Sequence, residues 1–144
     1  MSALALATPK ANPLLLDALQ RCERAFKSGR VDEIRAWVAV DALVETVASR
    51  GRAIGPDETV YALRTVRRRD PYYLVGTCQY EVITPATVLT AMPVRERSDA
   101  GGIRHHTVYR LTTGRDGVVW RQRLLRTREE ALACFAEHGP GLGL

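Results

Sequence analysis

The first half of the chain repeats apolar residues at helical spacing. Between residues 13 and 27 they lie three or four positions apart, which predicts a helix that Gly29 would cap. The repeating residues are Leu15, Leu19, Cys22 and Phe26. A second helix is predicted over residues 31–40, because its first turn would hold two acids that the helix dipole favours. A third, from about residue 55 to 68, begins at a Gly-Pro pair and has Val60, Leu63 and Val66 on one face.

The second half of the chain changes to a period of two after Asp70-Pro71. Runs rich in β-branched and aromatic residues alternate with turn signals such as SDAGG and GRDG. The predicted strands cover residues 42–47, 72–83, 86–97, 103–113 and 118–126, and a short helix follows over 128–136. This order predicts an α+β fold, a cone-shaped curved antiparallel β-sheet (a meander) with three N-terminal helices on its concave face and a short C-terminal helix. Such a cone has a pocket at its open end.

The chain of 144 residues is long enough for one core, so a single domain is expected over residues 13–137, between flexible tails at 1–12 and 138–144. No apolar run approaches the roughly 20 residues of a membrane helix, so no membrane association is expected. Three widely spaced cysteines without a CxxC motif favour a reducing compartment, for which the cytoplasm is the default, and exclude a zinc motif. We expect no cofactor and no metal.

The net charge of +5 comes almost entirely from arginine, with the densest run in RTVRRRD at residues 64–70. Nucleic-acid binding usually combines basic residues with stacking aromatics or a recognition helix. Aromatic residues make up only 6% of this chain. A solvated basic face is therefore expected, and nucleic acid is not an expected partner.

Two stretches resemble the nuclear transport factor 2-like superfamily, which includes ketosteroid isomerases, SnoaL-like polyketide cyclases, limonene epoxide hydrolase and scytalone dehydratase. FKSGRVDEIRAWVAVDALVE is similar to the helix, glycine turn, helix and short strand of that family, and GRDGVVWRQRLLRTREEAL to its turn, last strand and closing helix. The resemblance covers about residues 14–135. It implies a cone fold with an interior pocket and a homodimer formed through the outer face of the sheet.

The positions that carry catalysis in the family hold other residues here. Where ketosteroid isomerases have a tyrosine, a base aspartate and a protonated aspartic acid, a gapless match gives Cys22, Thr46 and Thr107. A thiol is a weak donor, and threonine cannot act as a base near neutral pH. The aspartate on the last strand of epoxide hydrolases is matched by Arg123, which cannot activate water. The standard family reactions are therefore not expected.

On the third long strand, alternation places His105, Thr107 and Tyr109 on one face, and the isomerase match makes that face the inner one. His105, with Tyr109, is then the candidate catalytic acid or base, because its ordinary pKa lies near neutrality. The alternative is a hydrogen-bonded histidine at the pocket mouth or the dimer face.

On the last strand, Arg121 and Arg123 share a face that the same match turns inward, where they would bind a carboxylate or phosphate. The alternative is a bulge that turns the strand over, so that Trp120 and Leu124 lie inside and both arginines meet solvent or acids. Thr46, Thr107 and Trp37 complete the candidate ligand contacts, although Trp37 also suits the core.

These observations predict a small protein with a ligand pocket. It would bind a small organic ligand, for which an anion is one candidate, or serve as a dimerisation module. The alternative is a SnoaL-like enzyme of the cyclase, isomerase, dehydratase or epoxide hydrolase type, using His105 with Tyr109 or Arg123. A small-molecule ligand and a second copy of the chain are the expected partners.

Overall fold

The computed structural model describes residues 10–47, 51–98 and 100–144, which form an α+β fold. The helices are α2 (Pro13–Ser28), the 3₁₀ helix η1 (Val31–Trp37), α3 (Gly55–Arg69), α4 (Arg128–His138) and a 3₁₀ turn η2 (Gly139–Gly141). Helix α2 begins where the Asn12 side chain accepts a hydrogen bond from the Leu14 amide, and it ends at Gly29, whose φ is 82°. No helix of the described residues is long and apolar enough to cross a membrane.

The strands form one sheet in the order β2-β1-β6-β5-β4-β3. Their bounds are β1 (Val38–Glu45), β2 (Arg52–Ile54), β3 (Gln79–Thr84), β4 (Thr87–Arg97), β5 (Ile103–Arg115) and β6 (Val118–Leu125). The strands β3 to β6 form the predicted antiparallel meander. The sheet as a whole is mixed, because β1 pairs with β6 in parallel.

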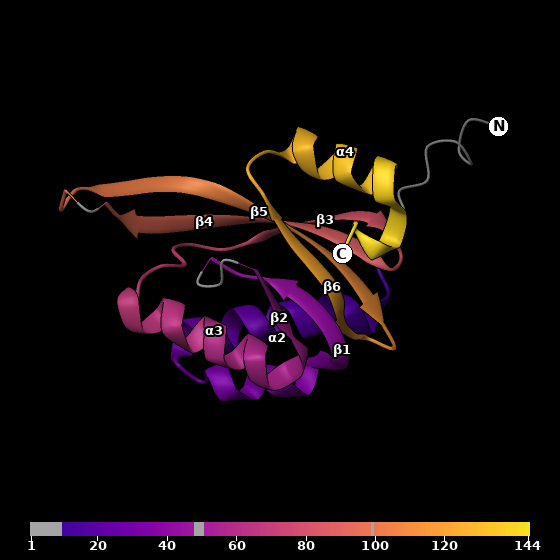
Figure 1. Cartoon of the computed structure of the whole chain (residues 1–144), viewed down its shortest axis with the longest axis horizontal. Helices are drawn as coiled ribbons and strands as arrows, with labels where there is room; N and C mark the ends of the chain where they lie inside the picture. Colours follow the sequence, from indigo (N-terminus) through magenta and orange to yellow (C-terminus); the bar gives the residue numbers. More distant parts are fainter. Residues whose placement is uncertain (1–9, 48–50, 99) are drawn as a thin grey trace.

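The curved sheet separates two helical layers (Figure 1). Helices α2 and α3 lie against its concave face, and α4 lies against the opposite face. The main core fills the space between the sheet and the first layer, where Leu15, Leu19, Val44, Val60 and Val88 are at most 1% exposed. A smaller cluster lies under α4. The predicted α+β cone is confirmed, and its interior lies on the α2 and α3 side.

Four local features differ from the sequence-based expectation. The second helix is a short 3₁₀ helix whose chain continues into β1 at Val38. The strand β2 was not predicted, and β3 begins at Gln79 rather than at residue 72, although Leu74 makes an isolated bridge to Val94. The expected C-terminal tail packs against the sheet, with Leu142 fully buried. The expected N-terminal tail lies, up to residue 9, outside the described residues.

Candidate functional site

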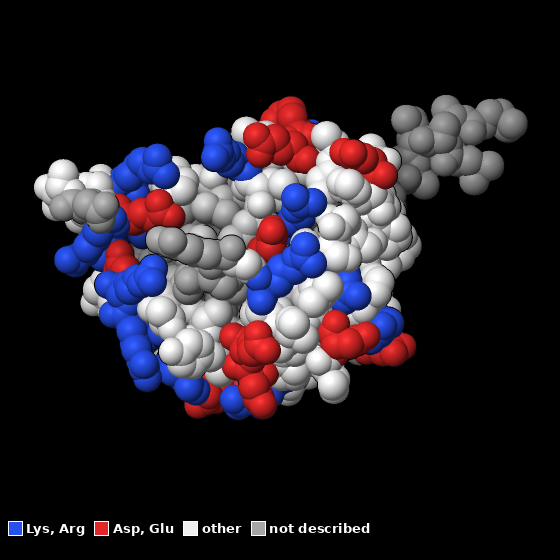
Figure 2. All heavy atoms as spheres, viewed as in Figure 1, with Lys and Arg blue, Asp and Glu red and all other residues white. Residues whose placement is uncertain are grey.

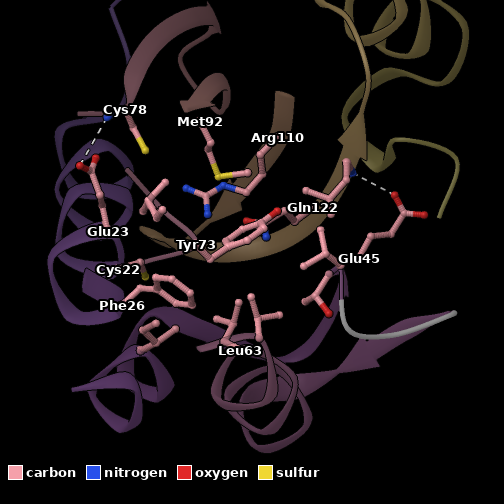
Figure 3. Close-up of a pocket in the computed structure, with 16 residues that line it drawn as sticks. Cys22, Glu23, Phe26, Glu45, Leu63, Tyr73, Cys78, Met92, Arg110 and Gln122 are labelled. Atoms are coloured by element: carbon pink, nitrogen blue, oxygen red, sulfur yellow. Dashed lines mark hydrogen bonds between the residues drawn. The ribbon is translucent and has the colours of Figure 1, made fainter. Parts of the chain in front are cut away.

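A cavity opens inside the cone between α2, α3 and the concave face of the sheet (Figure 3). The space open to the centre of a water molecule is about 70 Å³, several times the roughly 10–15 Å³ that one water needs, so the cavity is not filled by its own side chains. Most of its wall is apolar. The apolar residues include Phe26, Ile34, Leu63, Val66, Leu74, Met92 and Leu124. The polar side chains of the wall are few, so each of them determines what the cavity can bind.

Arg110 of β5 is the cation of this cavity. Its guanidinium reaches from the sheet into the centre of the cavity (Figure 3). The Nε atom is buried and has no hydrogen-bond partner, and the side chain makes no ion pair with any described residue. Arg110 also lines a small inner hollow beside Thr59, whose hydroxyl is likewise buried without a partner. The residue as a whole is half-buried. A partly desolvated cation with a buried, unsatisfied donor is costly to the fold, so its presence needs an explanation.

Tyr73 contributes a second donor to the same cavity. Its hydroxyl is buried and has no hydrogen-bond partner among the described residues. Burial, and to a lesser degree the negative charge of Glu96, raises the pKa of Tyr73, and the positive charge of Arg110 only partly offsets this rise. Tyr73 therefore stays neutral and can donate its proton in a hydrogen bond.

Glu23 forms the polar wall of the cavity on the α2 side. Its carboxylate accepts hydrogen bonds from the Tyr80 hydroxyl (2.6 Å), Lys27 Nζ (2.7 Å) and the Cys78 amide (3.4 Å). Burial acts to raise the pKa of Glu23, but the hydrogen bonds from Lys27 and Tyr80 outweigh it and lower the pKa. Glu23 is thus an anion whose oxygens are already engaged by its own neighbours.

The two cysteines of the cavity, Cys22 and Cys78, are neutral thiols. Burial raises the pKa of each to about 11, and the nearby charge of Arg110 offsets only part of that effect. A nucleophilic cysteine needs a lowered pKa. Both thiols therefore serve as wall residues rather than as nucleophiles.

Two further polar residues, Thr46 and Gln122, lie in the cavity wall. Gln122 Oε1 accepts a hydrogen bond from the Thr112 hydroxyl at 3.1 Å, which fixes the amide against the sheet. Thr46, the residue that follows β1, is buried in the cavity wall.

The other candidate residues of β5 lie outside the cavity. His105 and Thr107 are exposed, and Tyr109 packs in the cluster under α4. This corrects the expected orientation of the strand: the odd-numbered residues face outward and Arg110 faces the interior. The reason is the period of two, since a register that differs by one residue exchanges the two faces of a strand.

The arginines of β6 also lie on the outer face. Trp120 is an extra residue between the register pairs Thr113–Arg121 and Gly114–Val119, which identifies a bulge. Beyond it, Gln122 and Leu124 line the cavity, as the alternative with a bulge predicted for Leu124. Trp120 does not line it.

Both arginines donate hydrogen bonds to backbone carbonyl groups. Arg121 donates to the Asp41 carbonyl at 3.1 Å, and its guanidinium lies 4.0 Å from the centre of the Trp120 ring. Arg123 donates to the Leu142 carbonyl at 3.0 Å and lies 3.7 Å from a carboxylate oxygen of Glu45. Neither arginine lines the cavity, contrary to the orientation taken from the family match.

Two remaining residues lie at the edges of the site. Trp37 packs against the core cluster with the Arg21 guanidinium 5.3 Å from its ring centre, and it does not line the cavity. Glu45 lies at the cavity wall, where its carboxylate accepts a hydrogen bond from the Leu124 amide at 3.0 Å. Among the described residues, no group of three or more His, Cys, Asp or Glu side chains could hold a metal.

Sequence reasoning missed Arg110, Tyr73 and Glu23 as site residues. The alternation along β5 did place Arg110 on a common face with His106 and Val108, but the family match assigned that face to the outside. The available signal was an arginine with the β-branched residues Val108 and Thr112 two positions away on either side, on a strand predicted to lie inside the sheet.

No protein-family model and no curated protein matches the sequence. Solved structures do match. A polyketide cyclase described as putative from Sinorhizobium meliloti has a TM-score of 0.63 at 17% identity, covering 76% of this chain and 94% of that one. The Δ5-3-ketosteroid isomerase from Mycobacterium sp. has a TM-score of 0.58 at 18% identity, with coverage of 81% and 95%. A protein from Mycobacterium tuberculosis in complex with estradiol-17β-hemisuccinate has a TM-score of 0.59 at 12% identity, again with 81% and 95%.

These likenesses in three dimensions cover 76% to 81% of the chain. At identities below 20% they bear on the fold alone. The cone with its interior cavity, together with these likenesses, identifies the fold of the chain as that of the nuclear transport factor 2-like superfamily.

Proposed function

We propose that the protein binds a small organic anion, with a carboxylate as the preferred group, in the cavity around Arg110. The observation that carries this proposal is the half-buried Arg110 side chain in a largely apolar cavity, where its buried Nε atom has no hydrogen-bond partner and the guanidinium makes no ion pair with a described residue. A carboxylate would supply the missing counter-charge and could accept two hydrogen bonds from the planar guanidinium. The Tyr73 hydroxyl offers a further donor in the same cavity.

The walls determine the rest of the ligand. Because Phe26, Leu63, Met92 and Leu124 surround the cation, the part of the ligand attached to its carboxylate should be apolar. A neighbour with the same fold binds a steroid hemisuccinate, a ligand that combines an apolar body with an acid, which supports this type of occupant.

The hydrogen bonds that the carboxylates of the cavity wall accept favour ligand binding over catalysis. Glu23 and Glu45 are the carboxylates that line the cavity within the described part of the chain, and both accept hydrogen bonds from neighbouring groups. For Glu23, the hydrogen bonds from Lys27 and Tyr80 lower the pKa and make the carboxylate a weaker base. Arg110 and Tyr73 could stabilise an oxyanion, but Glu23 beside them is a poor base for proton abstraction.

The test is isothermal titration with straight-chain monocarboxylates of six to ten carbons and with the alcohols of equal length. The wild type should bind the acids and not the alcohols. Arg110→Met should weaken acid binding about ten- to hundredfold, the range for one hydrogen-bonded charged contact. Arg126→Met, which removes an exposed arginine at the end of β6, is the matched control and should bind like the wild type. Equal affinity for acids and alcohols, or an unchanged Arg110→Met, would refute the proposal.

A further inference from the structure

A second hollow adjoins the cavity on the side of the β4–β5 hairpin. It measures about 210 Å³ in space open to water centres and shares Val47, Val66 and Tyr73 with the wall of the cavity. We call this second hollow the vestibule. Its other lining residues come from the last turn of α3 and from the end of β4, and they are charged.

The charges of the vestibule do not cancel. Asp70 and Arg95 neutralise each other in an ion pair of 2.7 Å, supported by a second contact of 3.2 Å. Glu96 lies 3.0 Å from His106 Nε2 and 3.5 Å from an Arg104 nitrogen, so its carboxylate is engaged on the hairpin. The cations Arg69 and Arg97 remain.

Neither Arg69 nor Arg97 makes an ion pair with a described residue, and both are exposed. Arg97 still lies near enough to Asp70 to contribute, after Arg95, to lowering the pKa of that carboxyl. Figure 2 shows Lys and Arg side chains gathered at the end of the molecule where the hairpin and the end of α3 meet. The vestibule thus carries an uncompensated positive charge beside a cavity that holds another.

We propose that the ligand is an apolar molecule with an acidic group at each end, one bound by Arg110 in the cavity and the other by Arg69 and Arg97 in the vestibule. The arrangement of charged and apolar residues along the site supports this proposal. Arg110 lies in the cavity among apolar walls, and Arg69 and Arg97 line the adjoining vestibule. This inference rests on the proposed function, because it takes the Arg110 site as the inner end of the same ligand.

The experiment compares each monocarboxylate of six to ten carbons with the α,ω-dicarboxylate of equal length. A second carboxylate makes a molecule more hydrophilic, so a pocket with only one cationic centre would bind the dicarboxylate more weakly. We expect the opposite at the chain length that spans the site, a gain of about three- to tenfold, since two exposed ion pairs contribute modestly. The gain should shrink in 0.5 M salt, because exposed charges are screened.

The double variant Arg69→Gln/Arg97→Gln should lose this gain while it keeps the wild-type affinity for monocarboxylates. Arg68→Gln is the matched control, because Arg68 lies on the same turn of α3 outside the vestibule. Dicarboxylates that bind no tighter at any length, or a gain that survives in the double variant, would overturn the inference and leave the Arg110 site intact. If neither series binds in a way that depends on Arg110, the proposed function itself fails.

Discussion

Arg110 occupies a position where an apolar side chain would stabilise the fold better. Its neighbours in the cavity are mostly apolar, and its Nε atom has no hydrogen-bond partner among the described residues. Replacing a buried charge by an apolar side chain of similar volume is often neutral or stabilising. A residue that costs stability and has no structural partner is typical of a binding site.

Arg110→Met should therefore raise the free energy of unfolding of the ligand-free protein, by about 1 kcal/mol or more, while it weakens acid binding. Urea unfolding at neutral pH measures the change. Arg123→Met is the comparison, because that guanidinium has partners in Leu142 and Glu45, and its loss should lower the free energy of unfolding. An Arg110→Met variant less stable than the wild type would show that the guanidinium has a structural role.

At the scale of residues, the sequence predicted which side chains share a face of a strand, but not which of the two faces points into the cone. The alternation of β5 correctly grouped His105 with Thr107 and Tyr109 and separated them from Arg110. Which group points inward depends on the curvature of the sheet and on the helices that cover it, and neither is encoded in a single strand. The family match filled this gap with the wrong orientation.

At the scale of elements, Glu23 joins α2 to the segment that leads into β3. Its side chain is 11% exposed, and it receives hydrogen bonds from Lys27, Tyr80 and the Cys78 amide. Lys27 extends the link, because its ammonium also donates to the Gly76 carbonyl. Residues more than 50 positions apart in sequence are thereby held at one wall of the cavity.

Glu23→Gln should lower the free energy of unfolding by about 1–3 kcal/mol at pH 7, because it weakens hydrogen bonds to a buried charged group. The folded state lowers the pKa of Glu23 from its ordinary value of 4.5. The stabilisation is thus complete above pH 4.5 and is lost as the pH falls through the lower folded pKa. The difference between wild type and variant should therefore narrow below pH 4.5 in urea unfolding.

Asp17→Asn on the same helix provides the control for that series. Asp17 pairs with Arg21 at 2.7 Å, but both side chains are about half exposed. Such a pair contributes about 0.3–0.5 kcal/mol. If Glu23→Gln cost no more than Asp17→Asn, the link between α2 and β3 would have no energetic role.

Gly55 fixes the junction between β2 and α3. Its φ is 75°, and a Cβ atom there would lie 2.7 Å from the Val40 carbonyl oxygen. Gly55→Ala should cost about 2 kcal/mol or more in the free energy of unfolding, since both the backbone and the neighbouring strand would have to shift. Gly141→Ala is the control, because no heavy atom lies within 4 Å of its added Cβ and its φ is not positive. Equal stability of the two variants in urea unfolding would contradict this assignment.

Elements were predicted better than their irregularities. The helix α2, the long strands β4 and β5 and the helix α4 lie close to their predicted ranges, because each has a clear period and turn or cap residues at its ends. The bulge at Trp120 was predicted only as one of two alternatives, because an extra residue in one strand cannot be recognised from the pattern of apolar and polar residues. The strand β2 is three residues long, too short to show a period.

At the scale of the whole molecule, the C-terminal segment changes what the outer face of the sheet can do. Leu142 is fully buried, together with Ala131 and Cys134 of α4, against Leu89 and Leu111 of the sheet. The glycine-rich sequence GPGLGL gave no sign of this packing, because the contact exists only once the sheet is formed. Part of the surface that the family resemblance assigned to a second protomer is thus covered by the chain itself.

A homodimer remains the expected assembly, formed through the part of the outer face that α4 leaves open around Thr107. Two copies related by a twofold axis would shield this face, and light scattering at tens of micromolar should give about twice the 16.0 kDa of the chain. Thr107→Glu would place like charges opposite each other across the axis and should shift the mass toward one chain. Ala36→Glu, on the exposed side of η1, is the control and should leave the mass unchanged. A wild type that scatters as a single chain would mean that α4 and the C-terminal residues already cover as much of the outer face as the protein needs.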